Sequence, residues 1–147
     1  MSATTSPSAT RPFSQNPILF YLGYGTSLLA LGFGLNAFIN PANALSWFEL
    51  PPPSPDNISA TEFYRLMMQP YGARNIHVGI TMLASAWYRQ SKILGLSILS
   101  FAGVAIVDGV ACWQRGEGEW NHWCYAPQLI ILGSLLLGVM DGKKKAE

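Results

Sequence analysis

The chain has 147 residues, of which 50% are hydrophobic and only 12% are charged, and its formal net charge is +1. Soluble domains carry about 25% charged residues, so this composition excludes an ordinary soluble globule. The near-neutral charge argues against a nucleic-acid-binding surface, and two cysteines are too few for a disulfide scaffold. The chain is interpreted as one small all-α integral membrane domain.

Four apolar segments are about as long as the ~20 residues that a spanning helix needs. A tail rich in serine, threonine and proline precedes them and is expected to be disordered. For the first segment a secretory signal peptide is the alternative, but its apolar stretch exceeds the about 7–15 residues of such signals. A four-helix transmembrane bundle is therefore predicted, with a tail at residues 1–16, a membrane domain at 17–140 and spans at 18–38, 71–88, 93–113 and 122–140.

A long luminal loop is predicted between the first two spans, at residues 39–70. Its prolines at 51–53 cannot belong to a regular helix. Ser59 and Glu62 match a capping box, so a short surface helix is expected to begin there. That helix is expected to end before Pro70.

Four spans put both termini on the same side of the membrane. The positive-inside rule makes that side cytosolic, because it holds Arg11, Arg89, Lys92 and Lys143–Lys145. The basic C-terminal tail, residues 141–147, ends in Lys144-Lys145-Ala146-Glu147, which resembles a dilysine retrieval signal. A multi-pass protein of the endoplasmic reticulum membrane is predicted; a generic basic flank to the last span is the alternative.

Small residues form a stripe at helical spacing on the first span: Gly23, Ser27, Ala30 and Gly34. Such stripes let helix backbones approach closely. A compact bundle is sufficient to explain the stripe, and a homodimer seam is the alternative.

Polar residues of several spans are expected at the luminal end of the bundle. Arg74 and Asp108 each lie about one turn from that end, so at about 1.5 Å per residue they reach the same depth. A charge in a bilayer is costly, and the two are predicted to form an ion pair. His77 follows Arg74 by three residues on the same helix face. The remaining site candidates are Asn36, Asn75, Glu119, His122 and Trp123.

Two histidines beside carboxylates favour proton-transfer chemistry. Asp108 or His77 is predicted to act as general acid or base, with Arg74 orienting Asp108 or stabilising an anion. Asn75 and His122 are predicted to bind substrate or relay protons. Pro127, expected inside the fourth helix, would free a backbone carbonyl for this site. A structural ion pair is the simpler alternative.

Other chemistries receive little support from the sequence. His77, His122, Asp108 and Glu119 are conceivable metal ligands, but no HxxxH or HxxE spacing occurs on one helix, so no metal is predicted. No nucleotide-binding or nucleophile-elbow motif is present, so no cofactor is predicted. Cys112 and Cys124, the two cysteines, are expected near the luminal ends of adjacent spans, either as free thiols, which we favour, or as a disulfide.

Three segments resemble a fungal family of small four-span membrane proteins described as a domain of unknown function: Gly72-Ala73-Arg74-Asn75-Ile76, Val107-Asp108-Gly109 and Trp120-Asn121-His122-Trp123. The resemblance covers most of residues 17–140. It implies a fungal origin and a role in natural-product biosynthesis, without implying a reaction. In general layout alone, the bundle is also similar to sterol-isomerase-type enzymes.

The leading hypothesis is a membrane enzyme that isomerises or cyclises a lipophilic small molecule in fungal secondary metabolism, without a cofactor. The alternative is a non-catalytic scaffold, as a homodimer or with a partner biosynthetic enzyme. A transporter is the third hypothesis, but the cytosolic halves of the first and last spans offer no polar path.

Overall fold

The computed structural model describes residues 11–142 of the chain. Within this part there are helices and no strand, which confirms the predicted all-α class. The elements are η1 (Phe13–Gln15), α1 (Pro17–Ile39), α2 (Pro41–Ser46), α3 (Ile58–Trp87), α4 (Ser91–Arg115), α5 (Trp120–Trp123) and α6 (Ala126–Leu137). Most of the N-terminal tail and the dilysine-like signal lie outside the described residues.

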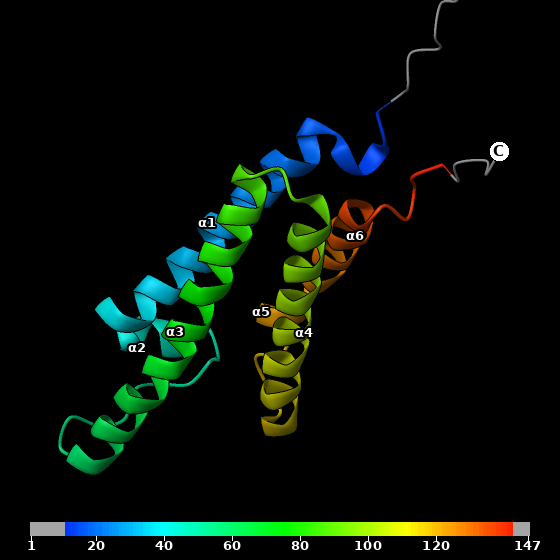
Figure 1. Cartoon of the computed structure of the whole chain (residues 1–147). Coiled ribbons are helices and arrows are strands. Elements are labelled where there is room, and N and C mark those ends of the chain that lie inside the picture. The colour runs from blue at the N-terminus through cyan, green and yellow to red at the C-terminus, as the bar shows by residue number, and fades with distance from the viewer. Residues whose placement is uncertain (1–10, 143–147) are drawn as a thin grey trace, which may run out of the picture.

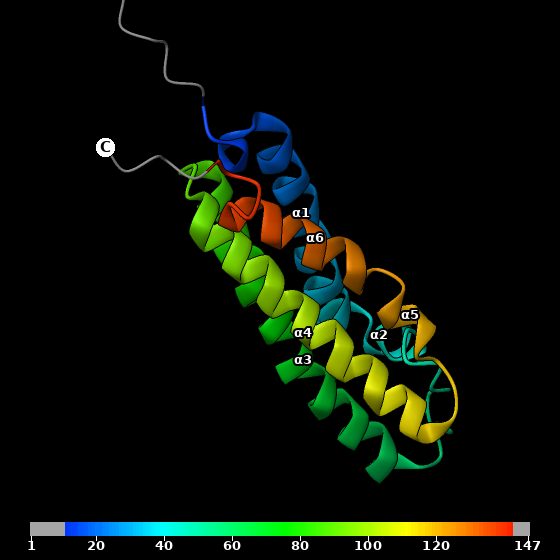
Figure 2. The same ribbon diagram turned by 90° about the vertical axis from the view of Figure 1, so that its right-hand side faces the viewer.

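The helices form two pairs. α1 packs along α3, α4 packs along α6, and the pairs meet through α3 and α4. Figure 1 shows the pairs closest at the turn between α3 and α4 and farther apart at the opposite end. Figure 2 shows α6 lying against α4 on the side of α1. The chain therefore runs down α1, up α3, down α4 and up α6.

Among the described residues, α1 and α4 are the two helices long and apolar enough to cross a membrane. Only 33% and 39% of their most apolar stretches are buried, whereas the core helix of a soluble protein would be mostly buried. Large apolar side chains such as Tyr21 (67% exposed), Leu29 (63%) and Ile39 (80%) face outward. A continuous apolar exterior of this kind favours a lipid environment.

The second predicted span is part of a longer helix than expected. α3 runs unbroken from Ile58 through Pro70, so the predicted separate surface helix and its end before this proline are wrong. Tertiary packing holds both sides of the proline in one helix, because Met68 is buried against α2 and Gly72 against α1. The helix is capped by Asn57, whose Oδ1 accepts from the Ala60 amide, instead of by Ser59.

The fourth predicted span is divided in two. α6 has 12 residues and starts at Ala126, and the short α5 precedes it. Pro127 therefore lies in the first turn of α6, where its missing N–H has no partner to lose. The expectation that Pro127 sits inside a helix starting near His122 and frees a carbonyl is wrong for this reason.

Glycines bring the helices of each pair into backbone contact. A Cβ at Gly34 would lie 2.8 Å from the carbonyl oxygen of Gly72, and one at Gly95 would lie 2.7 Å from that of Gly133. The small-residue stripe predicted on the first span is buried throughout. It faces the interior of the bundle, which agrees with the compact-bundle interpretation and leaves no stripe for a dimer seam.

The two ends of the described chain are joined by hydrogen bonds. The amide and hydroxyl of Ser14 donate to the two carboxylate oxygens of Asp141, at 2.8 and 2.7 Å. Lys92 Nζ donates to the carbonyl of Leu137 at 2.6 Å. The segment that precedes α1 is thus fixed to the segment that follows α6.

Candidate functional site

The predicted ion pair between α3 and α4 is confirmed. Arg74 Nη2 and Nη1 donate to the two carboxylate oxygens of Asp108, at 2.9 and 3.3 Å. The guanidinium also lies over the ring of Tyr71, 5.1 Å from its centroid. The side chain of Asp108 is 15% exposed and that of Arg74 36%, so the ion pair is partly buried, with the carboxylate the better shielded partner. This two-point contact fixes the orientation of the carboxylate.

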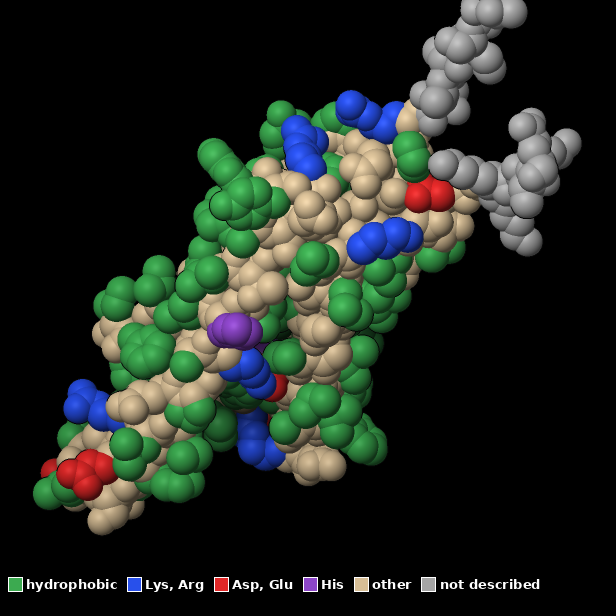
Figure 3. Space-filling model, in the orientation of Figure 1, with side chains coloured by type: hydrophobic (Ala, Val, Ile, Leu, Met, Phe, Trp, Pro, Cys, Tyr) green, Lys and Arg blue, Asp and Glu red, His purple; other side chains and the backbone are tan. Residues whose placement is uncertain are grey.

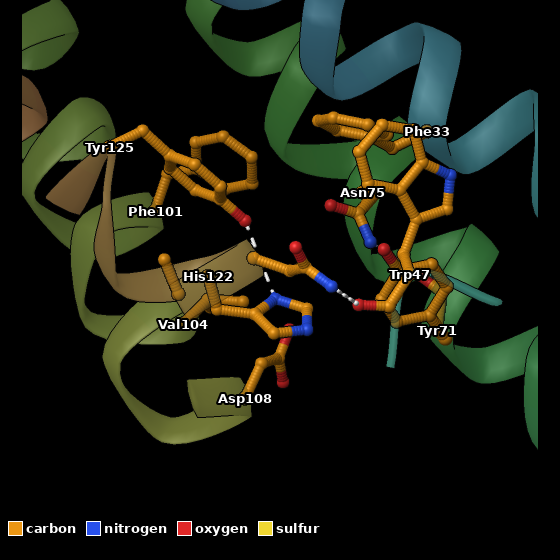
Figure 4. A pocket seen from close by; sticks show the side chains of 11 residues that line it. Phe33, Trp47, Tyr71, Asn75, Phe101, Val104, Asp108, His122 and Tyr125 are labelled. Atoms are coloured by element: carbon orange, nitrogen blue, oxygen red, sulfur yellow. Dashed lines mark hydrogen bonds between the residues drawn. The ribbon is translucent and has the colours of Figure 1, made fainter. Parts of the chain in front are cut away.

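His122 lies near this carboxylate, and both residues line the same cavity. Figure 4 shows its ring directly above Asp108, with the hydroxyl of Tyr125 directed at Nδ1. That contact is 3.4 Å long, and among the described residues Nε2 is buried without a hydrogen-bond partner.

A small cavity with a largely aromatic lining and a few polar groups lies between the two helix pairs at this level (Figure 4). Its free volume of about 10 Å³ has room for about one water molecule. Asn75 is 3% exposed and donates to the carbonyl of Tyr71, at 2.9 Å. The complete lining is Phe33, Trp47, Tyr71, Asn75, Phe101, Val104, Ala105, Asp108, Asn121, His122 and Tyr125.

The segment after α2 covers the cavity at its outer end. Asn121 Nδ2 donates to the carbonyl of Trp47 and to Glu49 Oε1, and Arg115 Nη2 donates to the carbonyl of Phe48. The Phe48 ring packs on His122, with centroids 4.7 Å apart. The cavity is thus closed on the side that faces away from the α3–α4 turn.

A second, larger hollow lies between α3 and α4. Its free volume is about 310 Å³, and it is lined by His77, Val78, Thr81, Leu96, Ser97 and Ser100. Figure 3 shows a histidine, a basic and an acidic side chain together at the edge of the cleft between these helices. We call this hollow the α3–α4 groove. His77 is exposed in it, one turn of α3 from Arg74, and does not line the cavity with His122.

Four predicted site residues line neither hollow: Arg74, which reaches the site through its ion pair, and Asn36, Trp123 and Glu119. Asn36 donates from Nδ2 to Asn43 Oδ1 at 2.9 Å, since α2 folds back directly after α1. Trp123 donates to the carbonyl of Ile106 and its ring contacts Gly109, outside the cavity. Glu119 is the N-cap residue of α5 and does not line the cavity.

Sequence reasoning missed the two tyrosines of the cavity. Tyr71 precedes Arg74 by three residues and Asn75 by four, so helical spacing could have identified it. Tyr125 follows His122 by three residues, but the two lie on different helical elements. Trp47 also lines the cavity and is not among the predicted site residues.

The metal-ligating candidates do not come together. In the part of the chain that the structure describes, no group of three or more histidine, cysteine, aspartate or glutamate side chains could hold a metal ion. Both thiols are free, with Cys112 buried and Cys124 exposed. The site thus consists of acid–base and hydrogen-bonding groups.

Comparison with known proteins gives one match. The model of a family described as a domain of unknown function, DUF4267, matches residues 27–136. This range includes the ion pair and both histidines. No curated protein and no solved structure matches the chain.

Proposed function

The chain belongs to the DUF4267 family, whose function is unknown, and from the geometry of its site we propose that it catalyses proton transfer within a lipophilic small molecule. The carrying observation is the buried His122 Nε2, which lacks a hydrogen-bond partner among residues 11–142 and lies near a carboxylate that Arg74 holds at two points. A buried polar atom without a partner costs stability unless a ligand completes it. The proposed reaction is a double-bond isomerisation or a cyclisation.

Each residue has a stated role in this proposal. In this proposal Nδ1 of a neutral His122 carries the ring proton and donates to the Tyr125 oxygen, so that Nε2 accepts a proton from an acidified C–H of the substrate. The same proton returns to another atom of the substrate, so the reaction needs no oxidant or reductant. Asp108 stabilises the imidazolium that forms, and Arg74 holds Asp108 and attracts negative charge developing on the substrate. Asn75 contributes a buried hydrogen-bonding side chain at the same level.

The substrate is proposed to enter from the membrane through the α3–α4 groove. The cavity beside His122 is far smaller than the about 300–1,000 Å³ of ordinary ligand sites, whereas the groove reaches this range. An apolar chain lying in the groove would bring its reactive end to the ion pair. His77 lines the groove one turn away and would bind a polar group of the substrate or exchange the proton.

The topology proposed for this activity has four crossings, with both ends in the cytosol. α1 and α4 run in the same direction, so the chain must return between them, and α3 connects them directly. The hydrogen bonds from Ser14 to Asp141 hold the two ends of the described chain together, which supports an even number of crossings with α6 as the last return. At about 18 Å, α6 is shorter than the ~30 Å hydrocarbon core, so α5 and the end of α4 complete the luminal side.

The cell compartment and the pathway belong to the proposal as well. The dilysine-like C-terminus favours the endoplasmic reticulum, and the resemblance to cluster-encoded fungal proteins favours natural-product biosynthesis. A redox-sensitive fluorescent protein fused to either end reads the orientation. Both fusions are expected to report a reducing cytosol, and an oxidised readout at either end would refute the orientation.

The function is tested by expressing the gene with its genomic neighbours in a heterologous fungus. We compare extracts of the wild type, Asp108→Asn, His122→Gln and Glu62→Gln, the last as an exposed carboxylate control. The expected result, with metabolite amounts normalised to protein level, is the loss of one product and the gain of an isomer of equal mass in Asp108→Asn and His122→Gln only. Unchanged metabolites in all variants would refute catalysis at this site.

The second candidate function is a scaffold for another membrane enzyme. The closed cavity of about 10 Å³ favours it, because the ion pair then needs only to lock the two helix pairs. In that case Asp108→Asn lowers the protein level and the recovery of a co-purifying partner together. No isomer of a metabolite would accumulate in that case.

A further inference from the structure

A group of basic side chains lies at the end of the molecule opposite the candidate site. Arg11 precedes η1, and Arg89 is in the turn between α3 and α4. With Gln15 these two residues line a hollow of about 370 Å³. Figure 3 shows basic side chains on this end, near the start of α1 and the α3–α4 turn. We call this hollow the basic hollow.

The donors of the basic hollow are available to a ligand. Within residues 11–142 the two ion pairs of the structure are Arg74–Asp108 and Arg115–Glu117, so neither Arg11 nor Arg89 has a described acidic partner. The nearest acidic group of this end, Asp141, is occupied by Ser14. Two guanidinium groups facing one hollow match the oxygen atoms of a phosphate.

The surrounding contacts hold this hollow in shape. Gln15 Nε2 donates to Ser91 Oγ at 2.9 Å, which ties η1 to the start of α4. The Arg89 guanidinium lies over the ring of Phe20, 4.9 Å from its centroid. Phe20 is 1% exposed, so this contact anchors the arginine to the core. The two arginines are thus presented from elements with fixed relative positions.

The position of the basic hollow at the membrane interface indicates that the phosphate belongs to a lipid. α1, one of the two helices able to cross a membrane, begins at Pro17, directly beside the hollow. Trp87 and Tyr88, each 71% exposed, lie at the same end, and such aromatics mark the headgroup region of a bilayer. Cations at this level attract anionic lipids.

We propose that the basic hollow of Arg11, Gln15 and Arg89 binds the phosphate of an anionic phospholipid headgroup. The inference is independent of the proposed catalysis, because it uses no residue of the candidate site. The acyl chains would lie along the exposed apolar faces that border the hollow. A free phosphate ion shares the chemistry of the headgroup, and the experiment separates the two.

The test uses the detergent-solubilised full chain and phosphatidylglycerol with a fluorophore on an acyl chain, followed by fluorescence anisotropy. Unlabelled phosphatidylglycerol is expected to displace the probe, and phosphatidylcholine is not. Arg89→Gln and Arg11→Gln are each expected to weaken binding about tenfold, because each removes a charged hydrogen bond to phosphate. Arg65→Gln, with the same charge change on exposed α3 far from the hollow, is expected to bind like the wild type.

Three results would overturn the proposal. Equal binding by all variants would exclude the basic hollow as the site. An equal loss of probe binding in Arg65→Gln would show that binding depends only on the net charge of the protein. Displacement of the probe by millimolar inorganic phosphate would assign the hollow to a free anion. Circular dichroism of each variant verifies folding, and the two arginine variants serve as replacements for one another if one fails to fold.

Discussion

The contact between α1 and α3 at Gly34 gives a prediction whose size follows from the structure. In Gly34→Ala the new Cβ would lie 2.6 Å from Ile76 Cγ1 and 2.8 Å from both Gly72 O and Ile76 N. Two of these three atoms belong to the backbone and cannot rotate away. Overpacking of this kind destabilises a protein by about 1–3 kcal/mol. The higher helix propensity of alanine over glycine opposes this with about 1 kcal/mol of stabilisation.

A matched control removes the helix-propensity contribution. Gly32→Ala is the same substitution two residues away, where a Cβ meets nothing within 4 Å. The difference in unfolding free energy between the two variants therefore isolates the steric cost, and we expect Gly34→Ala to be about 1–3 kcal/mol less stable. Titration with sodium dodecyl sulfate in mixed micelles, followed by circular dichroism, measures both. Agreement within about 0.5 kcal/mol would refute the close approach of α1 to α3.

Three further predictions follow from described contacts. Arg74→Gln and Asp108→Asn should each destabilise the fold, and the double variant should lose about 1–3 kcal/mol less than their sum, by the same titration; additive losses would refute the pairing. The hydrogen bonds from the backbone and side chain of Ser14 lower the pKa of Asp141 below its ordinary value of 3.8. The ionised carboxylate therefore stabilises the folded state above pH 3.8, and this stabilisation is lost as the pH falls through the lower pKa of the folded state. Thermal unfolding should therefore depend on acid less steeply in Asp141→Asn than in the wild type, and equal slopes would contradict it. Maleimide should label exposed Cys124 quickly and buried Cys112 only after unfolding, as mass spectrometry would detect; equal labelling rates would contradict the burial.

The sequence predicts how far along a helix a residue lies better than it predicts the side of the helix to which its side chain points. Arg74 and Asp108 were matched by their distance from the helix ends, which depends only on the rise per residue. His77 shares that approximate depth, but its direction depends on how α3 packs, and it faces the α3–α4 groove. Asn36 reaches the right level too, yet it bonds to Asn43 of the helix that follows. Direction requires the partners of each helix, which one sequence does not contain.

Prolines caused the main errors in the helix boundaries. At Pro70, packing on both sides outweighs the one missing hydrogen bond, and the helix continues. Pro127 lies at the start of α6, whereas the apolar pattern predicted that this helix begins several residues earlier. Local chemistry is the same at both positions, and the surrounding contacts decide the outcome.

The burial of the glycine stripe of α1 has a consequence for how the protein is made. Its partner glycine, Gly72, follows Gly34 by about 40 residues, which at about 5–20 residues per second takes roughly 2–8 seconds to synthesise. During this interval the stripe has no α3 to cover it and must be held by the insertion machinery or by lipid. α4, in contrast, emerges directly after α3 and can pair with it at once. We therefore expect chains truncated before α3 to associate through α1, and chains truncated after it to remain separate.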